Sequence, residues 1–404
     1  MYDYIIVGAG ISGLLAASKI SKRYPKAKIA VMEAYGTPGG RIQSYRKDGL
    51  SWEKGAGRIH SSHTMVNQLV AKYGLTKIKI SDQTNWRADH TSEPNHWPAI
   101  ATVIIESFSQ FSKQELQLHT LEGLLTKVLK GDTVLKMISQ FAYTSEITSL
   151  RADLALESLK KELGPVTGYF YTLAEGIQAI TDNLMKEAEA AGVKFFFNHR
   201  LTSLEHGLQT KLHFSKVEFS AKKVILAIHS EGLKGLAPFK NLPILKKIQM
   251  NPLLRIYGVF PLPAWFEGIP RTVTPAPLRH VIPINPKKGT IMTSYTDGED
   301  TKFWMNILKR YGEKGVSERI IQESEELFQK KIPEPHIFKM YYWKEGCSYW
   351  LPGLYNVHEY SKAIMQPLVK NPNIFVTGES YAVNQCWIES ALEHTTEMIN
   401  RYIL

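Results

Sequence analysis

Residues 1–42 constrain the fold of this chain more than any other segment. Their composition predicts an apolar strand over residues 4–7, a helix over residues 14–20 and a second apolar strand over residues 28–32. Between the first strand and the helix lies a glycine-rich turn, Gly8-Ala9-Gly10-Ile11-Ser12-Gly13. In a dinucleotide-binding unit the first glycine permits the tight turn, the second lets backbone approach a pyrophosphate, and the third packs helix against strand. The segment therefore predicts such a unit.

An acidic residue ends the second predicted strand. Glu33 follows the last glycine of the turn by twenty residues, and Ala34 comes next. A carboxylate at this place can accept hydrogen bonds from ribose hydroxyl groups. The pyrophosphate would contact unpaired N–H groups at the start of the helix, where the helix dipole also favours negative charge. A strand-turn-helix without a nucleotide is the less favoured interpretation.

The segment after Glu33 favours a flavin over a nicotinamide. Residues 36–42 contain the run Gly39-Gly40-Arg41. A glycine pair lets backbone press against a diphosphate, and the arginine places a guanidinium beside it. This segment resembles the second fingerprint of the flavin-dependent amine oxidase family, in which it lies over FAD. We therefore expect FAD as the cofactor.

Three more segments resemble the same family. Residues 55–60 begin with Gly55-Ala56-Gly57-Arg58 and resemble the glycine-rich turn beneath the isoalloxazine ring. Near the middle of the chain, the resemblance implies that backbone at Leu201 contacts the adenine. Residues 374–391 resemble the last motif, in which a strand, a Gly-Glu pair and a helix N-terminus hold the ribityl-diphosphate and the pyrimidine edge. The flavin contacts that this motif implies are Gly378, Glu379, Trp387, Ile388, Ser390 and Ala391.

The resemblance implies an α/β fold with a Rossmann-like FAD-binding domain and a discontinuous α+β substrate domain. Apolar positions at helical spacing in residues 103–163 predict a helical cap over the active site, ended by a turn at Gly164-Pro165. We expect the FAD-binding domain to comprise residues 1–62, 176–245 and 369–404, and the substrate domain residues 63–175 and 246–368. Since both domains consist of separated segments, truncation at a boundary should not leave a folded half.

Composition argues against several other classes of protein. The 44% hydrophobic and 22% charged residues are typical of a globular protein, and no window reaches the ~18 uninterrupted apolar residues of a membrane helix. Two cysteines suit a reducing compartment, so we expect a cytoplasmic protein without a membrane anchor. The net charge of +11 comes from dispersed lysine pairs without interleaved aromatics, so no nucleic-acid partner is expected. No Cys/His cluster supports a metal site.

With FAD bound, the expected reaction is oxidation of an amine to an imine, with O2 reduced to H2O2. The cofactor carries this chemistry, while the protein orients the substrate and excludes water. Aromatic walls suit the task because they disfavour a charged ammonium by desolvation and guide it by cation–π attraction. Trp343, Trp350 and Trp387 are the candidates, and the resemblance places Trp387 beside the flavin. For Trp343 and Trp350 a position in the core is an equal alternative.

Two arginines and one cysteine are further candidates. Arg58 stands where the resemblance to L-amino-acid oxidases implies a bidentate pair with a substrate carboxylate; contact with the flavin or an internal acid is the alternative. The resemblance to the amine oxidase family puts Arg255 where that family has a lysine that holds a water against flavin N5; the alternative is that the alignment slips and Arg255 is an ordinary residue. Because arginine is bulkier and does not deprotonate, normal oxygen reactivity is in question. Cys347 resembles the site of covalent flavin attachment in monoamine oxidases, and an inert thiol is its alternative.

These observations favour an FAD-dependent amine oxidase acting on a primary or secondary amine. Arg58 and residues 387–390 favour an L-amino acid or a derivative, and monoamines and polyamines stay open. The expected partners are a small-molecule amine and O2. An FAD-dependent isomerase of the UDP-galactopyranose mutase type is the alternative, because its N-terminal motif resembles residues 1–8. A flavoprotein fold kept as a binding scaffold, with catalysis lost at Arg255, is a third. The run at residues 39–41 and the C-terminal motif favour the oxidase.

Overall fold

The dinucleotide unit forms in the computed structural model, which describes residues 1–88, 91–163, 168–205, 209–215 and 217–404. Strand β1 (Tyr2–Val7) leads into helix α1 (Ile11–Arg23), and β2 (Ile29–Met32) follows. In the sheet, β1 lies between β2 and β13 (Glu218–Leu226) and runs parallel to both. Parallel strands are covered on both faces, which explains the uninterrupted apolar runs at residues 4–7 and 29–32.

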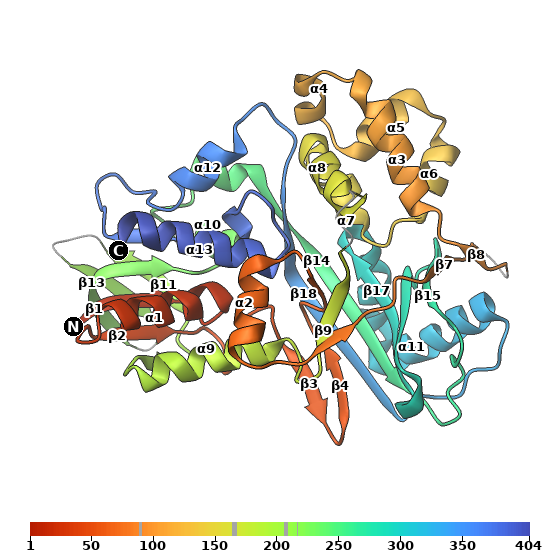
Figure 1. Ribbon diagram of the computed structural model, residues 1–404, viewed down its shortest axis with the longest axis horizontal. Helices are drawn as coiled ribbons and strands as arrows, with labels where there is room; N and C mark the ends of the chain where they lie inside the picture. Colours follow the sequence, from red (N-terminus) through yellow and green to blue (C-terminus); the bar gives the residue numbers. More distant parts are fainter. Residues whose placement is uncertain (89–90, 164–167, 206–208, 216) are drawn as a thin grey trace.

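The first sheet gathers strands from distant parts of the chain. Its order is β10-β2-β1-β13-β12-β11, and β19 pairs with β13. Strands β10, β2, β1, β13 and β19 are parallel, whereas β11 and β12 add an antiparallel edge. Helices α9 and α13 pack against α1, and both chain termini lie on this side of the molecule (Figure 1). The bounds are β10 (Lys194–Phe196), β11 (Leu201–Glu205), β12 (Thr210–Phe214), β19 (Ile374–Val376), α9 (Gln178–Ala190), α10 (Ser230–Lys234), α12 (Val357–Ala363) and α13 (Ile388–Tyr402).

A second sheet, with the order β18-β14-β17-β16-β15-β7-β8, fills the other half of the molecule. Helix α11 (Thr301–Phe328) packs against β14 and β17, and Gly312 interrupts its helical geometry. The bounds are β7 (Thr84–Trp86), β8 (Glu93–Pro94), β14 (Ile248–Val259), β15 (Arg271–Val273), β16 (His280–Asn285), β17 (Thr290–Asp297) and β18 (Ile337–Trp350).

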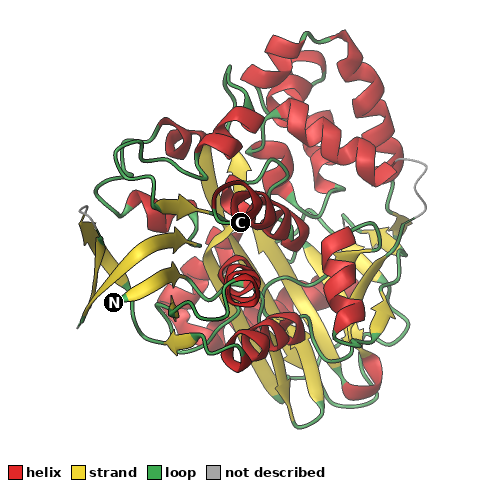
Figure 2. Cartoon of the chain, turned by 60° about the vertical axis from the view of Figure 1, so that its left-hand side comes forward, coloured by secondary structure: helices red, strands yellow, loops and turns green. Residues whose placement is uncertain are grey.

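The predicted helical cap is confirmed as six short helices, α3 to α8, that form a bundle of their own (Figures 1 and 2). They enclose their own core, to which Leu121, Leu124 and Leu125 contribute. The turn predicted at Gly164-Pro165 lies outside the described residues. The bounds are α3 (Trp97–Ser107), α4 (Lys113–Leu118), α5 (Leu121–Val128), α6 (Gly131–Ser139), α7 (Thr144–Thr148) and α8 (Ala152–Leu163).

Short elements connect the two halves. Strand β9 (Phe170–Leu173) pairs with β5 (Ile59–His60) and β6 (Lys77–Lys79), while β3 (Ser44–Lys47) and β4 (Leu50–Glu53) form a hairpin. The remaining helix α2 (Thr64–Lys72) is tied to α13, because the Glu389 carboxylate accepts hydrogen bonds from the N–H groups of Met65 and Val66. The strands of each sheet fall within the segments predicted for the two domains, and the domain boundaries themselves stay a prediction.

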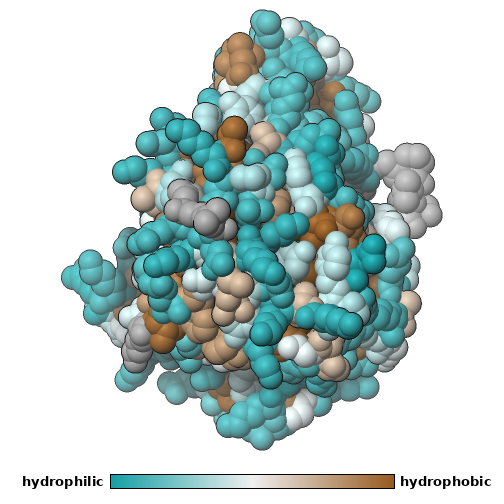
Figure 3. Space-filling view, turned by 90° about the vertical axis from the view of Figure 1, so that its left-hand side faces the viewer, coloured by the Kyte–Doolittle hydropathy of each residue, from teal (hydrophilic) through white to brown (hydrophobic). Residues whose placement is uncertain are grey.

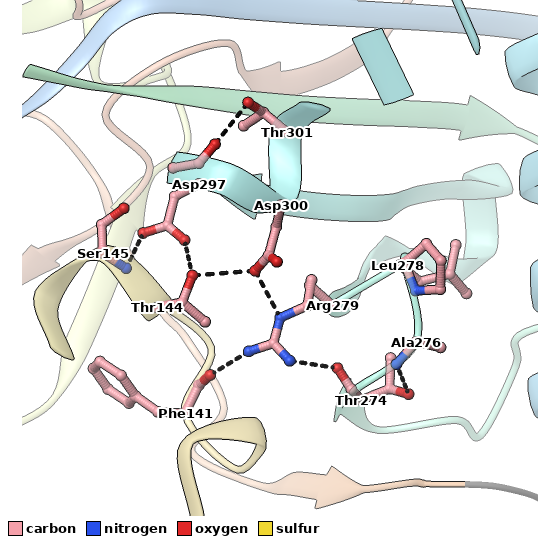
Figure 4. A network of polar contacts seen from close by, with 12 residues as sticks. Phe141, Thr144, Ser145, Thr274, Ala276, Leu278, Arg279, Asp297, Asp300 and Thr301 are labelled. Atoms are coloured by element: carbon pink, nitrogen blue, oxygen red, sulfur yellow. Dashed lines mark hydrogen bonds and ion pairs between the residues drawn. The ribbon is translucent and has the colours of Figure 1, made fainter. Parts of the chain in front are cut away.

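A buried polar network joins the helical cap to the second sheet (Figure 4). The guanidinium of Arg279 forms an ion pair with Asp300 at 3.2 Å and donates to the carbonyl oxygens of Phe141 at 2.8 Å and Thr274 at 3.0 Å. The hydroxyl of Thr144, at the start of α7, donates to Asp297 at 2.9 Å and to Asp300 at 3.1 Å. This network sets the cap against the ends of β15, β16 and β17.

The face of the molecule on the side of the first sheet resembles the surface of an ordinary globular protein (Figure 3). Viewed from the side of the first sheet, it is largely hydrophilic, with apolar side chains in small separate groups (Figure 3). None of the helices in the described part of the chain combines the length and apolar character needed to cross a bilayer.

The buried His394 predicts that the protein loses stability in acid. Its ring nitrogens contact the Thr377 hydroxyl at 3.2 Å and the Ser361 carbonyl oxygen at 3.1 Å, and burial lowers its pKa to about 4. The unfolded chain therefore binds more protons between pH 6.5 and 4, so the free energy of unfolding falls as the pH falls through this window. From pH 7.5 to pH 5 we expect His394 to account for about 2 kcal/mol of that loss. Urea unfolding at both pH values should show a smaller loss in His394→Asn, and equal losses would contradict the prediction.

Candidate active site

A continuous cavity of about 2060 Å³ runs from the first sheet to the second. The residues predicted to contact the cofactor line it, except Ala9 and Gly13. Those lining it are Gly8, Gly10, Ile11, Ser12, Glu33, Ala34, Gly39, Gly40, Arg41, Gly55, Ala56, Gly57, Arg58, Leu201, Gly378, Glu379, Trp387, Ile388, Ser390 and Ala391. Motifs from the first 58 residues and the motif at residues 378–391 therefore share one cavity.

Ala9 and Gly13 shape the glycine turn from behind the cavity wall. A Cβ on Gly13 would lie 1.9 Å from the Gly8 carbonyl oxygen, so the first turn of α1 packs directly on the backbone of the loop. Gly8 itself has a φ of +104°, which favours glycine. In contrast, a Cβ on Gly10 would meet nothing within 4 Å, because Gly10 faces the cavity. The three glycines thus occupy the positions predicted for turn, pyrophosphate approach and helix packing.

Glu33 links the glycine turn to the end of β2. Its carboxylate accepts hydrogen bonds from the N–H groups of Ala9 at 2.8 Å and Tyr35 at 2.9 Å, one on each oxygen. A carboxylate oxygen can accept more than one hydrogen bond, so Glu33 retains acceptor capacity toward the cavity that it lines. This arrangement fits a ribose whose hydroxyl groups donate to Glu33.

An ion pair joins the N-terminal and C-terminal motifs. Arg41 lies 2.7 Å from the Glu379 carboxylate and also donates to the Gly346 carbonyl oxygen of β18 at 3.0 Å. The other oxygen of Glu379 accepts from the Cys386 N–H at 2.6 Å. The two residues were predicted as separate cofactor contacts, and their pairing went unpredicted because nothing local in sequence indicates it.

The turn at residues 55–57 packs against the backbone of Arg41 and the side chain of Arg255. A Cβ on Gly55 would lie 2.0 Å from the Arg41 carbonyl oxygen, and a Cβ on Gly57 would lie 2.6 Å from Nη1 of Arg255. Arg255 is buried on β14, donates to the Glu53 carbonyl oxygen at 3.2 Å and lies 4.8 Å from the ring centre of Tyr295. Arg255 therefore lies beside the turn predicted to support the isoalloxazine ring, and its role in oxygen reactivity stays a prediction.

Arg58 is surrounded by aromatic rings. Its guanidinium carbon lies 4.2 Å from the ring centre of Phe170, 4.7 Å from that of Tyr143 and 5.4 Å from that of Trp387. Phe170 and Trp387 are nearly parallel, with ring centres 6.0 Å apart. Such contacts hold a guanidinium in place by cation–π attraction. Neither Phe170 nor Tyr143 was predicted as a site residue, because nothing local in sequence places either ring beside Arg58.

His63 contacts Trp387 from another side, with ring centres 5.0 Å apart. Burial, then the charges of His60 and Arg58, lower the pKa of His63 to about 4. The ring is therefore neutral at pH 7. In the described part of the chain, no group of three or more His, Cys, Asp or Glu side chains is placed to hold a metal ion.

The two tryptophan candidates of β18 have different surroundings. Trp343 lines the cavity beside Gly55 and donates to the Lys54 carbonyl oxygen at 2.7 Å. Trp350 is fully buried in the core beneath the first sheet, donates to the Ala382 carbonyl oxygen at 3.0 Å and does not line the cavity. The two are an odd number of positions apart on the strand, and neighbouring side chains point to opposite faces. We therefore correct the assignment of Trp350 to a packing residue.

Both cysteines line the cavity as free thiols. Cys386 donates to the Ser348 carbonyl oxygen at 3.2 Å, and its contact with Cys347 together with burial raises its pKa well above the usual range. Cys386 therefore stays protonated at neutral pH. The covalent flavin link through Cys347 remains a prediction.

The comparison with protein families decides the class. A model of the flavin-containing amine oxidoreductases matches residues 11–396, nearly the whole chain. The chain belongs to this family. The amine oxidoreductase accordingly has FAD as its cofactor. In its motifs, glycines such as Gly8, Gly13 and Gly55 lie where an added Cβ would clash with backbone, and this close backbone packing fits FAD. The motifs at residues 8–13, 39–41, 55–57 and 378–391 would hold its diphosphate and ring system, with Glu33 at the ribose.

Curated relatives match only part of the amine oxidoreductase. Coproporphyrinogen III oxidase from Staphylococcus aureus is 37% identical over 79 residues, 20% of this chain and 17% of its own length. L-amino-acid oxidase from Mus musculus is 36% identical over 90 residues, 21% of this chain and 14% of its own length. The matched part is thus less than a fifth of either relative.

Solved structures match the entire fold. A putrescine oxidase variant superimposes with a TM-score of 0.79 at 16% identity, covering 99% of both chains. A putative protoporphyrinogen oxidase from Exiguobacterium gives a TM-score of 0.76 at 16% identity, covering 98% of this chain and 97% of its own. These likenesses confirm the predicted α/β architecture and say nothing about the substrate.

Proposed function

We propose that this amine oxidoreductase oxidises an amine that carries a carboxylate, such as an L-amino acid, to an imine, with O2 reduced to H2O2. The observation that carries the proposal is Arg58, a guanidinium held among aromatic rings in the cavity. When bound, FAD supplies the two-electron oxidation of the carbon–nitrogen bond and the reduction of O2. The side chains of the cavity supply binding, orientation and the exclusion of water.

Arg58 would orient the substrate through its carboxylate. A guanidinium offers two parallel hydrogen bonds to a carboxylate, which set direction as well as distance. Its contacts with Phe170 and Trp387 restrict its motion, so less conformational freedom is lost when the substrate binds. A fixed carboxylate limits the positions open to the carbon that bears the amine, and such positioning lowers the barrier.

The aromatic rings would also select the neutral amine. An ammonium would lose hydration in the part of the cavity that Phe170 and Trp387 line, which would favour its deprotonated form. His63 is neutral and therefore adds no positive charge beside Trp387. Within the described residues, Nε of Arg255 has no hydrogen-bond partner, and we propose that it donates to a water beside the turn at residues 55–57.

Peroxide release separates this proposal from its rivals. The holoenzyme is incubated in air with a panel of amines and L-amino acids, and H2O2 is measured. We expect peroxide with at least one amino acid. An isomerase of the UDP-galactopyranose mutase type would instead act on a nucleotide sugar only after chemical reduction of its flavin. A binding scaffold would do neither.

Replacing Arg58 by lysine tests the carboxylate contact. Lysine keeps the charge and loses the bidentate geometry, so kcat/KM for the preferred amino acid should fall by about tenfold or more. For the matching amine without a carboxylate, kcat/KM should change little. Equal losses for both compounds in steady-state assays would indicate a structural role for Arg58, and unchanged kinetics for both would remove the contact.

A further inference from the structure

Positive charge lines the cavity beyond Arg58. Arg271 on β15 and His280 on β16 also line it, and Arg255 on β14 lies nearby. Within the described residues, Nε of Arg271 and both ring nitrogens of His280 are buried and have no hydrogen-bond partner. Water cannot readily replace a partner for His280, because its side chain is only 1% exposed. Buried polar groups normally have hydrogen-bond partners. Two neighbouring side chains that lack them beside a cavity therefore indicate a ligand that supplies the acceptors.

The carboxylates of Asp297 and Asp300 bind other partners, while the charge of Asp82, which also lines the cavity, opposes the lowering of the Arg271 pKa. Asp300 pairs with Arg279, and Asp297 accepts hydrogen bonds from Thr144 and from the N–H of Ser145. In the described part of the chain, no carboxylate forms an ion pair with Arg271 or Arg255. Arg271 is half-buried and its Nη1 donates to the Ser81 carbonyl oxygen at 3.2 Å, whereas its buried Nε has no acceptor within the described residues. An anionic ligand would supply that acceptor.

The second cationic group is next to Arg58. Tyr143 lies between them, with its ring centre 4.7 Å from the Arg58 guanidinium carbon and 6.1 Å from the His280 ring centre. Burial lowers the pKa of Arg271, and a hydrogen bond with Tyr143 opposes that effect. Burial, then the charges of Arg271 and Arg58, hold the pKa of His280 well below its usual range. His280 is therefore a neutral ring that can donate one hydrogen bond, beside a charged guanidinium.

We infer that the cavity binds a substrate with two anionic groups, one held by Arg58 and the other by Arg271 with His280. The inference deepens the proposed function, since it assumes that the substrate carboxylate lies at Arg58. Because one tyrosine contacts both arginines, the two anionic groups of the substrate lie close together. An amino acid with a carboxylate in its side chain fits this description. A tetrapyrrole with propionate groups shares the chemistry and is the larger alternative.

A binding titration of the FAD-loaded enzyme tests the inference without turnover. Glutarate and pentanoate have the same number of carbons, but only glutarate carries a second carboxylate. The perturbation of the flavin absorbance reports binding of each compound. A second charge-assisted contact is worth on the order of a tenfold gain in affinity or more, so glutarate should bind at least about tenfold tighter. Equal affinities in the wild type would overturn the inference.

Variants then locate the second site. Arg271→Gln should remove the preference for glutarate and leave pentanoate unchanged. Arg310→Gln, the same exchange at an exposed position of α11, should keep the preference. Should Arg271→Gln fail to fold, His280→Asn provides the second variant and should reduce the preference. Equal weakening of both ligands by Arg271→Gln or His280→Asn would mean that these residues only support the fold.

Further probes separate the two substrate sources and the two proposals. If the large ligand is correct, a porphyrin with two propionates should bind tighter than glutarate and lose affinity in Arg271→Gln. If the substrate is an amino acid, glutarate should bind tightly and lose affinity in Arg271→Gln, and the porphyrin should not. If the enzyme prefers glutarate but releases no peroxide with any amino acid, the proposed function is refuted and the inference of two anionic sites is supported. Peroxide from amino acids without that preference would do the reverse.

Discussion

Gly13→Ala is expected to give a protein that does not retain flavin and unfolds at a much lower temperature. The added Cβ would lie 1.9 Å from the carbonyl oxygen of Gly8, and backbone on both sides leaves no flexible side chain to move away. Overpacking in cores destabilises by about 1–3 kcal/mol, and contact with rigid backbone belongs at or above the top of that range. Thermal unfolding and the ratio of absorbance at 450 and 280 nm measure the two effects.

Two other glycines provide matched controls for this variant. Gly131 begins α6, and a Cβ there would meet nothing within 4 Å, so Gly131→Ala should be neutral or slightly stabilising. Gly10 has a φ of −76° and faces open cavity, so Gly10→Ala should fold normally yet bind flavin more weakly. Flavin content and melting temperature of Gly13→Ala equal to those of the wild type would refute the packing role of the third glycine.

Glu379→Gln is expected to lower both the free energy of unfolding of the apoprotein and its affinity for FAD. The substitution keeps an oxygen for the N–H of Cys386 but leaves Arg41 without its carboxylate. Breaking a buried pair by removing one partner is worth about 3–5 kcal/mol. Since the Arg41 side chain is 31% exposed and Glu379 only 8%, we expect about 3 kcal/mol, the lower end. Chemical unfolding of the flavin-free protein measures the loss.

A surface pair on the same C-terminal part of the chain serves as the control. Glu397 and Arg401 form an exposed ion pair at 2.9 Å on α13, so Glu397→Gln should change the free energy of unfolding by less than about 0.5 kcal/mol. A double-mutant cycle with Arg41→Gln isolates the coupling between Arg41 and Glu379. Coupling energies near zero would show that the ion pair does not join the two motifs energetically.

The cofactor motifs were predictable because each depends on residues close together in sequence. The glycine turn connects a strand directly to a helix, so all its residues are neighbours in sequence. The position of Glu33 follows from the combined length of that helix and the next strand. Resemblance to the family then added the segments at residues 39–41, 55–58 and 374–391. Trp350 shows the limit, since its local sequence resembles that of Trp343 while the alternation of β18 turns it into the core.

The sequence by itself determined the flavin fold and the residues along the nucleotide path, because local backbone geometry and glycine spacing decide them. Only the tertiary structure decided that Arg41 pairs with Glu379, that Phe170 and Tyr143 surround Arg58, and that Arg271 and His280 line the same cavity. These contacts join segments from both sheets and the helical cap. They arise from the pairing of distant strands, and no periodicity or motif along the chain carries that information.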